Sequence, residues 1–202
     1  MGYPWGDILH SLETGEQDFS VPDDLPYGDL VPDRLLEAAV LVPLRRLESG
    51  WEVILTVRTH ELRRHAGQIS FPGGRSELDD PTRLATALRE TEEEIGVEPA
   101  HVTPLGCLDP IVTITGYSVF PFVGRVSEAA ELRRDAREVA EIFSVPLDFL
   151  LDPDNCRTER AFFKGRQREY HVFPYRHYKI WGATAAMLRD LARRFRALDS
   201  DG

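Results

Sequence analysis

Short apolar, β-branched segments along the chain predict a succession of β-strands. Residues 37–46 and 51–59 are separated only by "LESG", so they predict a β-hairpin. Further strand candidates follow at residues 102–113, 117–126 and 140–150. Residues 169–182, "EYHVFPYRHYKIWG", predict either a last pair of strands or a strand and a turn.

Two segments carry apolar residues at helical spacing. In residues 81–95 one narrow stripe is formed by Leu84, Leu88, Thr91 and Ile95. Asp80 is the expected N-cap, Pro81 suits the first helical position, and Gly96 suits the left-handed position after the end.

The second helical segment, residues 182–198, ends the domain. Its apolar face is formed by Ala185, Leu188, Leu191 and Phe195. Because strands and helices mingle along the chain, the predicted class is α/β (α+β), with helices packed on a mixed sheet.

Residues 1–33 are rich in Pro, Gly and Asp, and we expect an extended N-terminal arm with one short helix near residues 7–12. One domain, residues 34–202, follows. No apolar run approaches the roughly 20 residues that a membrane helix needs. The start of the chain lacks the basic and apolar regions of a secretory signal. These features favour a cytoplasmic protein without a membrane partner.

The formal net charge of -10 argues against nucleic acid as a general partner, because nucleic-acid binding needs a basic surface. A small anionic ligand held by local arginines or by metal ions remains compatible with this net charge. Cys107 and Cys156 form no metal-spaced motif, and we expect two reduced, buried thiols. The sequence leaves the oligomeric state open, with a homodimer as one option.

Four glutamates crowd the end of the first helical segment. Glu90, Glu93 and Glu94 share the side opposite the apolar stripe, and Glu92 stands apart from them. Like charges one turn apart repel, and the helix dipole disfavours them at this end. A solvated acidic face is one interpretation. The other is a site for Mg²⁺ or Mn²⁺ in phosphate chemistry, because these cations prefer carboxylate oxygens.

The segment "RETEEEIGV" after a double glycine resembles the Nudix box, G-x5-E-x7-R-E-U-x-E-E-x-G-U, where U is apolar. The matching residues are Arg89, Glu90, Glu93, Glu94, Gly96 and Val97. The loop from Gly74 to Arg89 is one residue longer than in the box. Pro81 occupies the place of the first glutamate, with Asp79 and Asp80 just ahead, and Thr91 replaces an apolar residue.

Residues 54–74, "ILTVRTHELRRHAGQISFPGG", are similar to the signature of the coenzyme A diphosphatase branch, L-L-T-x-R-[SA]-x3-R-x3-G-x3-F-P-G-G. The residues in register are Leu55, Thr56, Arg58, Arg63, Gly67, Phe71, Pro72, Gly73 and Gly74. The resemblance implies the Nudix fold, a mixed β-sheet sandwiched between α-helices. It also implies Mg²⁺- or Mn²⁺-dependent hydrolysis of coenzyme A or acyl-CoA to 4'-phosphopantetheine (or its acyl form) and adenosine 3',5'-bisphosphate.

The same resemblance suggests roles for the acidic residues. Glu90 and Glu94 are the expected metal ligands, and Glu93 adds a further ligand or orients a metal-bound water. Arg89 is expected to hold a box carboxylate in place. The general base is either a box glutamate or a later acid, with Glu138 preferred and Glu141 second. The alternative for both later acids is a solvated position at the edge of a strand.

An arginine-rich patch precedes the double glycine. Arg58 and Arg63 are expected to bind substrate phosphates, whereas Arg64 and His60 are expected at the surface. Gly73 and Gly74 allow the backbone to approach phosphate or metal closely, or merely form a turn. For Trp181, a buried anchor is favoured over stacking on a base.

Two rival functions remain at this stage. One is a Nudix hydrolase for another nucleoside diphosphate derivative, such as ADP-ribose, NADH or an oxidised nucleotide. The other is a nucleotide sensor without catalysis, which the intact set from Arg89 to Glu94 disfavours.

Overall fold

The protein is built on a large mixed sheet, seen in a computed structural model that describes residues 34–59 and 67–199. The eight strands of this sheet are β1 Leu36–Leu47, β2 Gly50–Arg58, β3 Ile69–Ser70, β4 Gly73–Arg75, β5 Val102–Cys107, β6 Ile111–Val112, β7 Tyr117–Val126 and β8 Val139–Pro146. The predicted N-terminal arm, including its short helix, lies outside the described residues.

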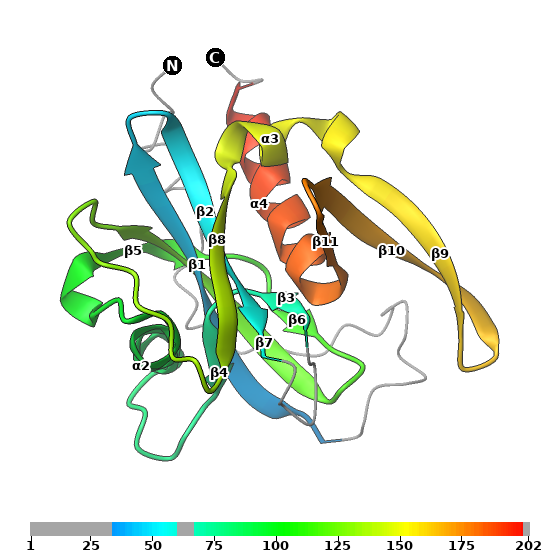
Figure 1. The fold of residues 1–202 in the computed structure, drawn as a ribbon. Helices are drawn as coiled ribbons and strands as arrows, with labels where there is room; N and C mark the ends of the chain where they lie inside the picture. Colours follow the sequence, from blue (N-terminus) through cyan, green and yellow to red (C-terminus); the bar gives the residue numbers. More distant parts are fainter. Residues whose placement is uncertain (1–33, 60–66, 200–202) are drawn as a thin grey trace.

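Strand β1 organises the sheet. It forms the predicted antiparallel hairpin with β2, and on its other side it pairs in parallel with β7 over a register that starts at Leu36↔Tyr117. Strand β8 pairs with β2, and the short strand β4 pairs with β1. This arrangement brings the ends of β2, β4 and β8 together at one end of the sheet (Figure 1).

Helices cover both faces of the sheet, as the predicted mixed fold requires. The helix α2, Arg83–Ile95, lies on one face, and α3, Leu147–Leu151, and α4, Gly182–Asp199, lie on the other (Figure 1). Short helices η2 and η3 span Pro99–His101 and Pro153–Asn155.

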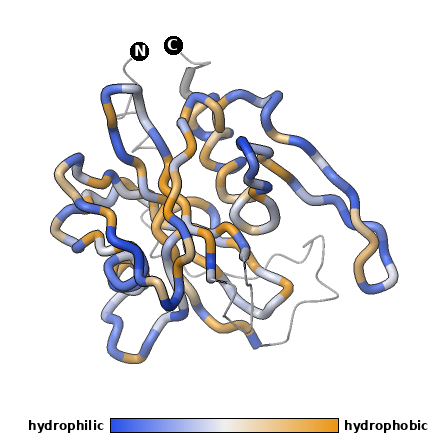
Figure 2. The backbone as a smooth tube through the Cα atoms, viewed as in Figure 1, coloured by the Kyte–Doolittle hydropathy of each residue, from blue (hydrophilic) through white to orange (hydrophobic). Residues whose placement is uncertain are grey.

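Alternation along β1 decides which side chains reach each helix. Ala39 and Leu41 pack with the buried face of α2, whereas Val42 and Leu44 pack in the cluster that includes α4. All four predicted residues of the α4 face are buried. The hydrophobic stretches accordingly run through the centre of the sheet, and polar ones follow the loops (Figure 2).

Three antiparallel strands form a second sheet beside α4. They are β9 Arg157–Phe163, β10 Arg166–Tyr175 and β11 Tyr178–Trp181, in the order β11-β10-β9. The last two strands confirm the predicted pair. The expectation of a buried Trp181 was wrong, because the side chain is 46% exposed and meets Tyr170 edge to face at the sheet surface. Phe162, near the end of the β9–β10 hairpin, is 78% exposed.

Two predicted boundaries were also wrong. Thr82, and not Asp80, caps α2: its hydroxyl accepts from the N–H of Ala85 at 3.1 Å, and the carboxylate of Asp80 is engaged elsewhere. The strand predicted over residues 140–150 ends at Pro146, after which residues 147–151 turn into α3. Gly96 does end α2 in the left-handed conformation, with φ 73°.

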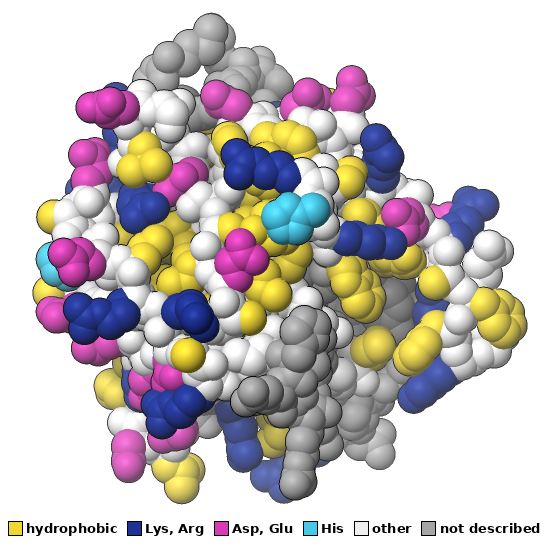
Figure 3. All heavy atoms as spheres, in the orientation of Figure 1, with side chains coloured by type: hydrophobic (Ala, Val, Ile, Leu, Met, Phe, Trp, Pro, Cys, Tyr) yellow, Lys and Arg dark blue, Asp and Glu magenta, His cyan; other side chains and the backbone are white. Residues whose placement is uncertain are grey.

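The distribution of surface charge and the burial of the two cysteines agree in part with the predictions from the sequence. Acidic and basic side chains are interspersed over the face shown in Figure 3, without a large basic field. Within the described residues, no helix combines the length and apolar character needed to cross a membrane. Neither cysteine forms a disulfide bond; Cys107 is buried, whereas Cys156 is only half-buried.

Packing of α4 is expected to dominate the stability of the domain. Leu188→Ala removes a side chain with no exposed area and should lower the free energy of unfolding by about 3 kcal/mol. Leu78→Ala, the same change at a fully exposed leucine, should cost less than about 0.5 kcal/mol. Urea denaturation of both variants tests this, and equal losses would contradict the packing.

Candidate active site

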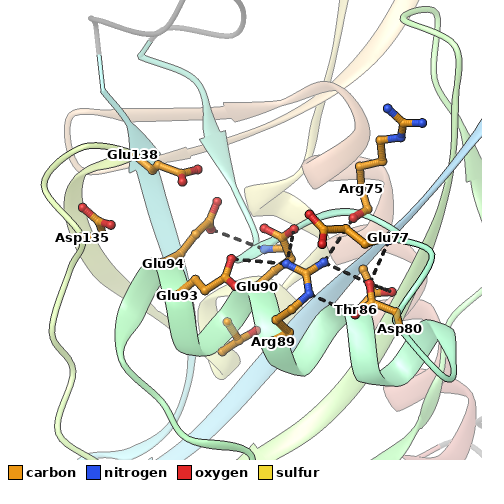
Figure 4. Close-up of polar contacts among 12 residues, drawn as sticks. Arg75, Glu77, Asp80, Thr86, Arg89, Glu90, Glu93, Glu94, Asp135 and Glu138 are labelled. Carbon is orange, nitrogen blue, oxygen red and sulfur yellow. Dashed lines mark hydrogen bonds and ion pairs between the residues drawn. The ribbon is translucent and has the colours of Figure 1, made fainter.

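The acidic side of α2 faces the meeting point of β2, β4 and β8. Figure 4 shows Glu90, Glu93 and Glu94 rising from the helix, with Glu138 across from Glu94. Glu92 is exposed and stands apart, as its helical position predicted. The structure thus brings together the box acids and one of the two later acids.

Glu94 is the most buried of these acids, with a side chain that is 2% exposed. Its Oε1 accepts from Nη1 of Arg58 at 3.2 Å, and its Oε2 accepts from the N–H of Gly73 at 3.4 Å. Burial raises the pKa of Glu94 to about 7, although Arg58 and the Gly73 N–H oppose the shift. Two segments of the upstream signature therefore converge on one box carboxylate.

Glu90 lies one turn earlier, against the double glycine. A side chain at Gly74 would collide with the Glu90 carboxylate, and one at Gly73 would collide with the backbone of β1. Burial raises the pKa of Glu90, while Arg89 acts in the opposite direction. Both glycines are thus needed because no space exists for a Cβ atom.

Arg89 links the helix to the preceding loop. Its Nε and Nη2 donate to Asp80, each at 3.0 Å, and its Nη1 donates to Glu90 at 3.0 Å and Glu93 at 3.3 Å. The charge-assisted bonds from Arg89 hold the pKa of Asp80 well below its usual range. Asp80 also accepts from the hydroxyl of Thr86 at 2.9 Å.

Asp80 was predicted as an N-cap and not as a residue of the site. The signal was present, because Asp80 precedes the position of the missing box glutamate by one residue and the loop is one residue longer. The extra residue is absorbed within the loop, where the N–H of Glu77 donates to the carboxylate of Asp80 at 2.9 Å.

The two later acids occupy different surroundings. Glu138, just before β8, is 46% exposed and lies 4.0 Å from Nη2 of Arg58. Its negative charge contributes to the raised pKa of both Glu94 and Glu90. Glu141 instead accepts from the hydroxyl of Tyr178 at 2.5 Å, beside the stacked ring of Phe143. The surroundings of Glu138 therefore suit a role beside the box better than those of Glu141.

Part of the predicted basic patch cannot be placed. Arg63, Arg64 and His60 lie outside the described residues, whereas Arg58 lies inside the acidic cluster.

Carboxylate oxygens, the ligands that a hard cation prefers, are present, but they are not arranged around one common point. No group of three or more His, Cys, Asp or Glu side chains within residues 34–59 and 67–199 is arranged to hold a metal ion. Arg58 and Arg89 instead neutralise Glu94 and Glu90. The two guanidinium groups supply the positive charge that a divalent cation would otherwise supply. Because the carboxylate oxygens of Glu90 and Glu94 are ligands that such a cation prefers, these residues fit it chemically.

Comparisons with known proteins show the family of this chain. The NUDIX domain family matches residues 35–165. A protein of Citrobacter koseri named "Uncharacterized Nudix hydrolase NudL" is 37% identical over 157 residues, which cover 77% of this chain and 81% of that protein. The chain therefore belongs to the Nudix hydrolase family.

Solved structures share the fold at low sequence identity. A binary complex of a C. elegans Ap4A hydrolase superposes with a TM-score of 0.54 at 17% identity, covering 82% of this chain and 99% of that one. A MutT protein from Methanosarcina mazei Go1 superposes with a TM-score of 0.53 at 20% identity, covering 83% and 98%. At these identities the likeness extends to the fold alone.

The Asp80–Arg89 pair should contribute measurably to stability. Asp80→Asn removes the charge that accepts two bonds from Arg89 and should lower the free energy of unfolding by about 2 kcal/mol. Asp79→Asn, the same change at the exposed neighbour, should change it by less than about 0.5 kcal/mol. Chemical denaturation measures both, and indistinguishable variants would rule out the structural role of the pair.

The raised pKa of Glu94 predicts a pH-dependent stability in the presence of EDTA. Between pH 4.5 and about 7 the folded protein retains a proton that the unfolded chain has released, so the free energy of unfolding falls as the pH rises. Relative to Glu94→Gln, the native protein should lose on the order of 2 to 3 kcal/mol across this window. Denaturation at several pH values measures the difference, and a constant difference would disprove the shift.

Proposed function

We propose that this Nudix hydrolase cleaves the diphosphate bond of coenzyme A and its acyl derivatives, with a divalent cation. The products are 4'-phosphopantetheine, or its acyl form, and adenosine 3',5'-bisphosphate. One observation carries the proposal: Arg58 and Gly73, from the two ends of the coenzyme A signature, both bond to Glu94 of the box. The signature and the catalytic helix thus form one site.

The carboxylates of α2 supply the cation ligands in this proposal. Glu90 and Glu94 are the first candidates because they are crowded, partly or fully buried, and have raised pKa values that a bound cation would reverse. Glu93, whose side chain is 57% exposed, is free to add a ligand or orient a water. Mg²⁺ or Mn²⁺ would neutralise the diphosphate and lower the pKa of the attacking water.

Other residues position these groups and the substrate. Arg89 holds Glu90 and Glu93 from one side, with its own orientation fixed by Asp80. Glu138 is our candidate for the general base, because it faces Glu94 and is accessible to water. Arg58 neutralises Glu94 in the cation-free protein, and we expect it to turn to a substrate phosphate when a cation takes over.

The double glycine places the backbone of β4 directly against the box carboxylates. No side chain fits between Gly74 and the Glu90 carboxylate or between Gly73 and β1, and the N–H of Gly73 bonds to Glu94. We include both glycines in the substrate site, together with Arg63, which the coenzyme A signature contributes.

Product analysis tests the reaction. Coenzyme A incubated with the protein and Mg²⁺ or Mn²⁺ should give the two products named above, as resolved by chromatography and mass spectrometry. Glu94→Gln should lower kcat by a factor on the order of a thousand, because a cation ligand is lost. Glu92→Gln, the same change at the exposed neighbour, should leave the rate unchanged.

The results separate three cases. Cleavage of ADP-ribose, NADH or an oxidised nucleotide without cleavage of coenzyme A would replace the substrate. Binding of coenzyme A without turnover of any of these compounds would indicate a sensor. Equal effects of Glu94→Gln and Glu92→Gln would remove Glu94 from the cation site.

A further inference from the structure

A pocket of about 200 Å³ lies between α4, η3 and the β9–β10 sheet. Its apolar wall includes Leu150 and Phe173, which belong to the hydrophobic cluster on the α4 side of the large sheet. The helix α2 packs on the opposite side of that sheet (Figure 1). The pocket is therefore separate from the candidate active site.

The described side chains that line this pocket carry a net positive charge. Arg189 and Arg196, two turns apart on α4, both contribute to it, and none of the described residues that line it carries a carboxylate. Burial raises the pKa of the Cys156 thiol, so this lining group stays neutral as well. A positive pocket is notable in a chain with a net charge of -10.

The neighbouring arginines of α4 differ in their partners. Arg193 and Arg194 pair with Asp190 at 2.6 and 3.0 Å, and Arg194 also pairs with Asp109 at 2.6 Å. The contacts of the arginines that line the pocket include neutral groups. Nη1 of Arg189 meets the imidazole of His171 at 2.7 Å, and Nη1 of Arg196 donates to the carbonyl of Leu151 at 3.0 Å.

The Arg189–His171 contact fixes the hydrogen-bond pattern of the pocket. A guanidinium group only donates, so Nε2 of His171 must accept and the ring proton must sit on Nδ1. Nδ1 lies 3.4 Å from the hydroxyl oxygen of Thr158, which then accepts and can direct its own proton elsewhere. Burial and the charge of Arg189 lower the pKa of His171, consistent with a neutral ring.

These groups form a set of hydrogen-bond donors from two elements, α4 and β9. Arg189 retains N–H groups beyond the one given to His171, Arg196 is anchored at the end of α3, and Thr158 supplies a hydroxyl. Guanidinium and hydroxyl donors that line one pocket match the oxygens of a tetrahedral oxyanion. A divalent cation is excluded by the two positive charges.

We propose that this pocket binds an oxyanion of the phosphate class, either inorganic phosphate or the phosphate group of a small monoester. The anion bridges Arg189 and Arg196 and accepts from Thr158. Because the groups belong to α4 and β9, binding fastens the small sheet to the helix. The proposal does not depend on the substrate of the catalytic site.

Calorimetric titration with inorganic phosphate tests the proposal, in EDTA and at constant ionic strength. We expect saturable binding that weakens at least about tenfold in Arg189→Gln, because a charged bidentate donor is lost. Arg193→Gln is the matched control, since this exposed arginine of the same helix lies outside the pocket and should change the affinity less than about twofold. Equal affinities of the two variants, or no saturable binding to either wild type or control, would overturn the proposal.

A second variant and a second readout locate the bound anion. Arg58→Gln should retain the phosphate affinity, because Arg58 lies at Glu94 on the other side of the sheet. The imidazole NMR signals of His171 should shift on titration in wild type and Arg58→Gln. Loss of binding in Arg58→Gln with unmoved His171 signals would assign the anion to the catalytic site and refute the pocket.

Phenyl phosphate distinguishes the two sources of the anion. Tighter binding of phenyl phosphate than of inorganic phosphate, still dependent on Arg189, would identify a monoester whose organic group packs on Leu150 and Phe173. Equal or weaker binding of phenyl phosphate would identify inorganic phosphate as the ligand.

Discussion

Burial of one carboxylate is the constraint on which the candidate site depends. Glu94 projects from α2 into the junction of β2 and β4, where it is removed from water and bonded to Arg58 and Gly73. A buried carboxylate is costly unless positive charge or hydrogen-bond donors compensate it. This requirement explains why an arginine ends β2. At the neighbouring Glu90 the same need is met by Arg89, and the glycines that begin β4 leave room for β1 and for the Glu90 carboxylate.

The sheet separates two regions with opposite electrostatic character. On the α2 side, carboxylates outnumber the arginines that neutralise them, which suits cations and their phosphate ligands. On the α4 side, Arg189 and Arg196 line a pocket whose described lining residues carry no carboxylate, which suits an anion directly. Alternation along the central strands makes this separation possible, because adjacent residues of β1 contribute to different hydrophobic clusters.

The family motif predicted the local structure where this sequence matches the motif, and it gave no prediction where the sequence departs from it. Gly96 ends α2 as predicted because only its local backbone conformation mattered. Asp80 was misassigned as a cap, since the longer loop lets it fold back onto Arg89 and Thr86. Strand β9 was not predicted because its sequence, "RTERAFF", lacks the apolar alternation of a buried strand and lies exposed at the edge of a small sheet.

The sequence by itself determined most of the long strands, the two long helices, the apolar stripe of α2, the apolar face of α4 and the shared helix side of Glu90, Glu93 and Glu94, because these follow from periodicity over a few residues. Only the tertiary structure decided which distant groups meet. The pairing of Arg58 with Glu94, the position of Glu138 beside the box, the exposure of Trp181 and the Arg189–His171 contact all depend on strand register and helix packing across long stretches of chain.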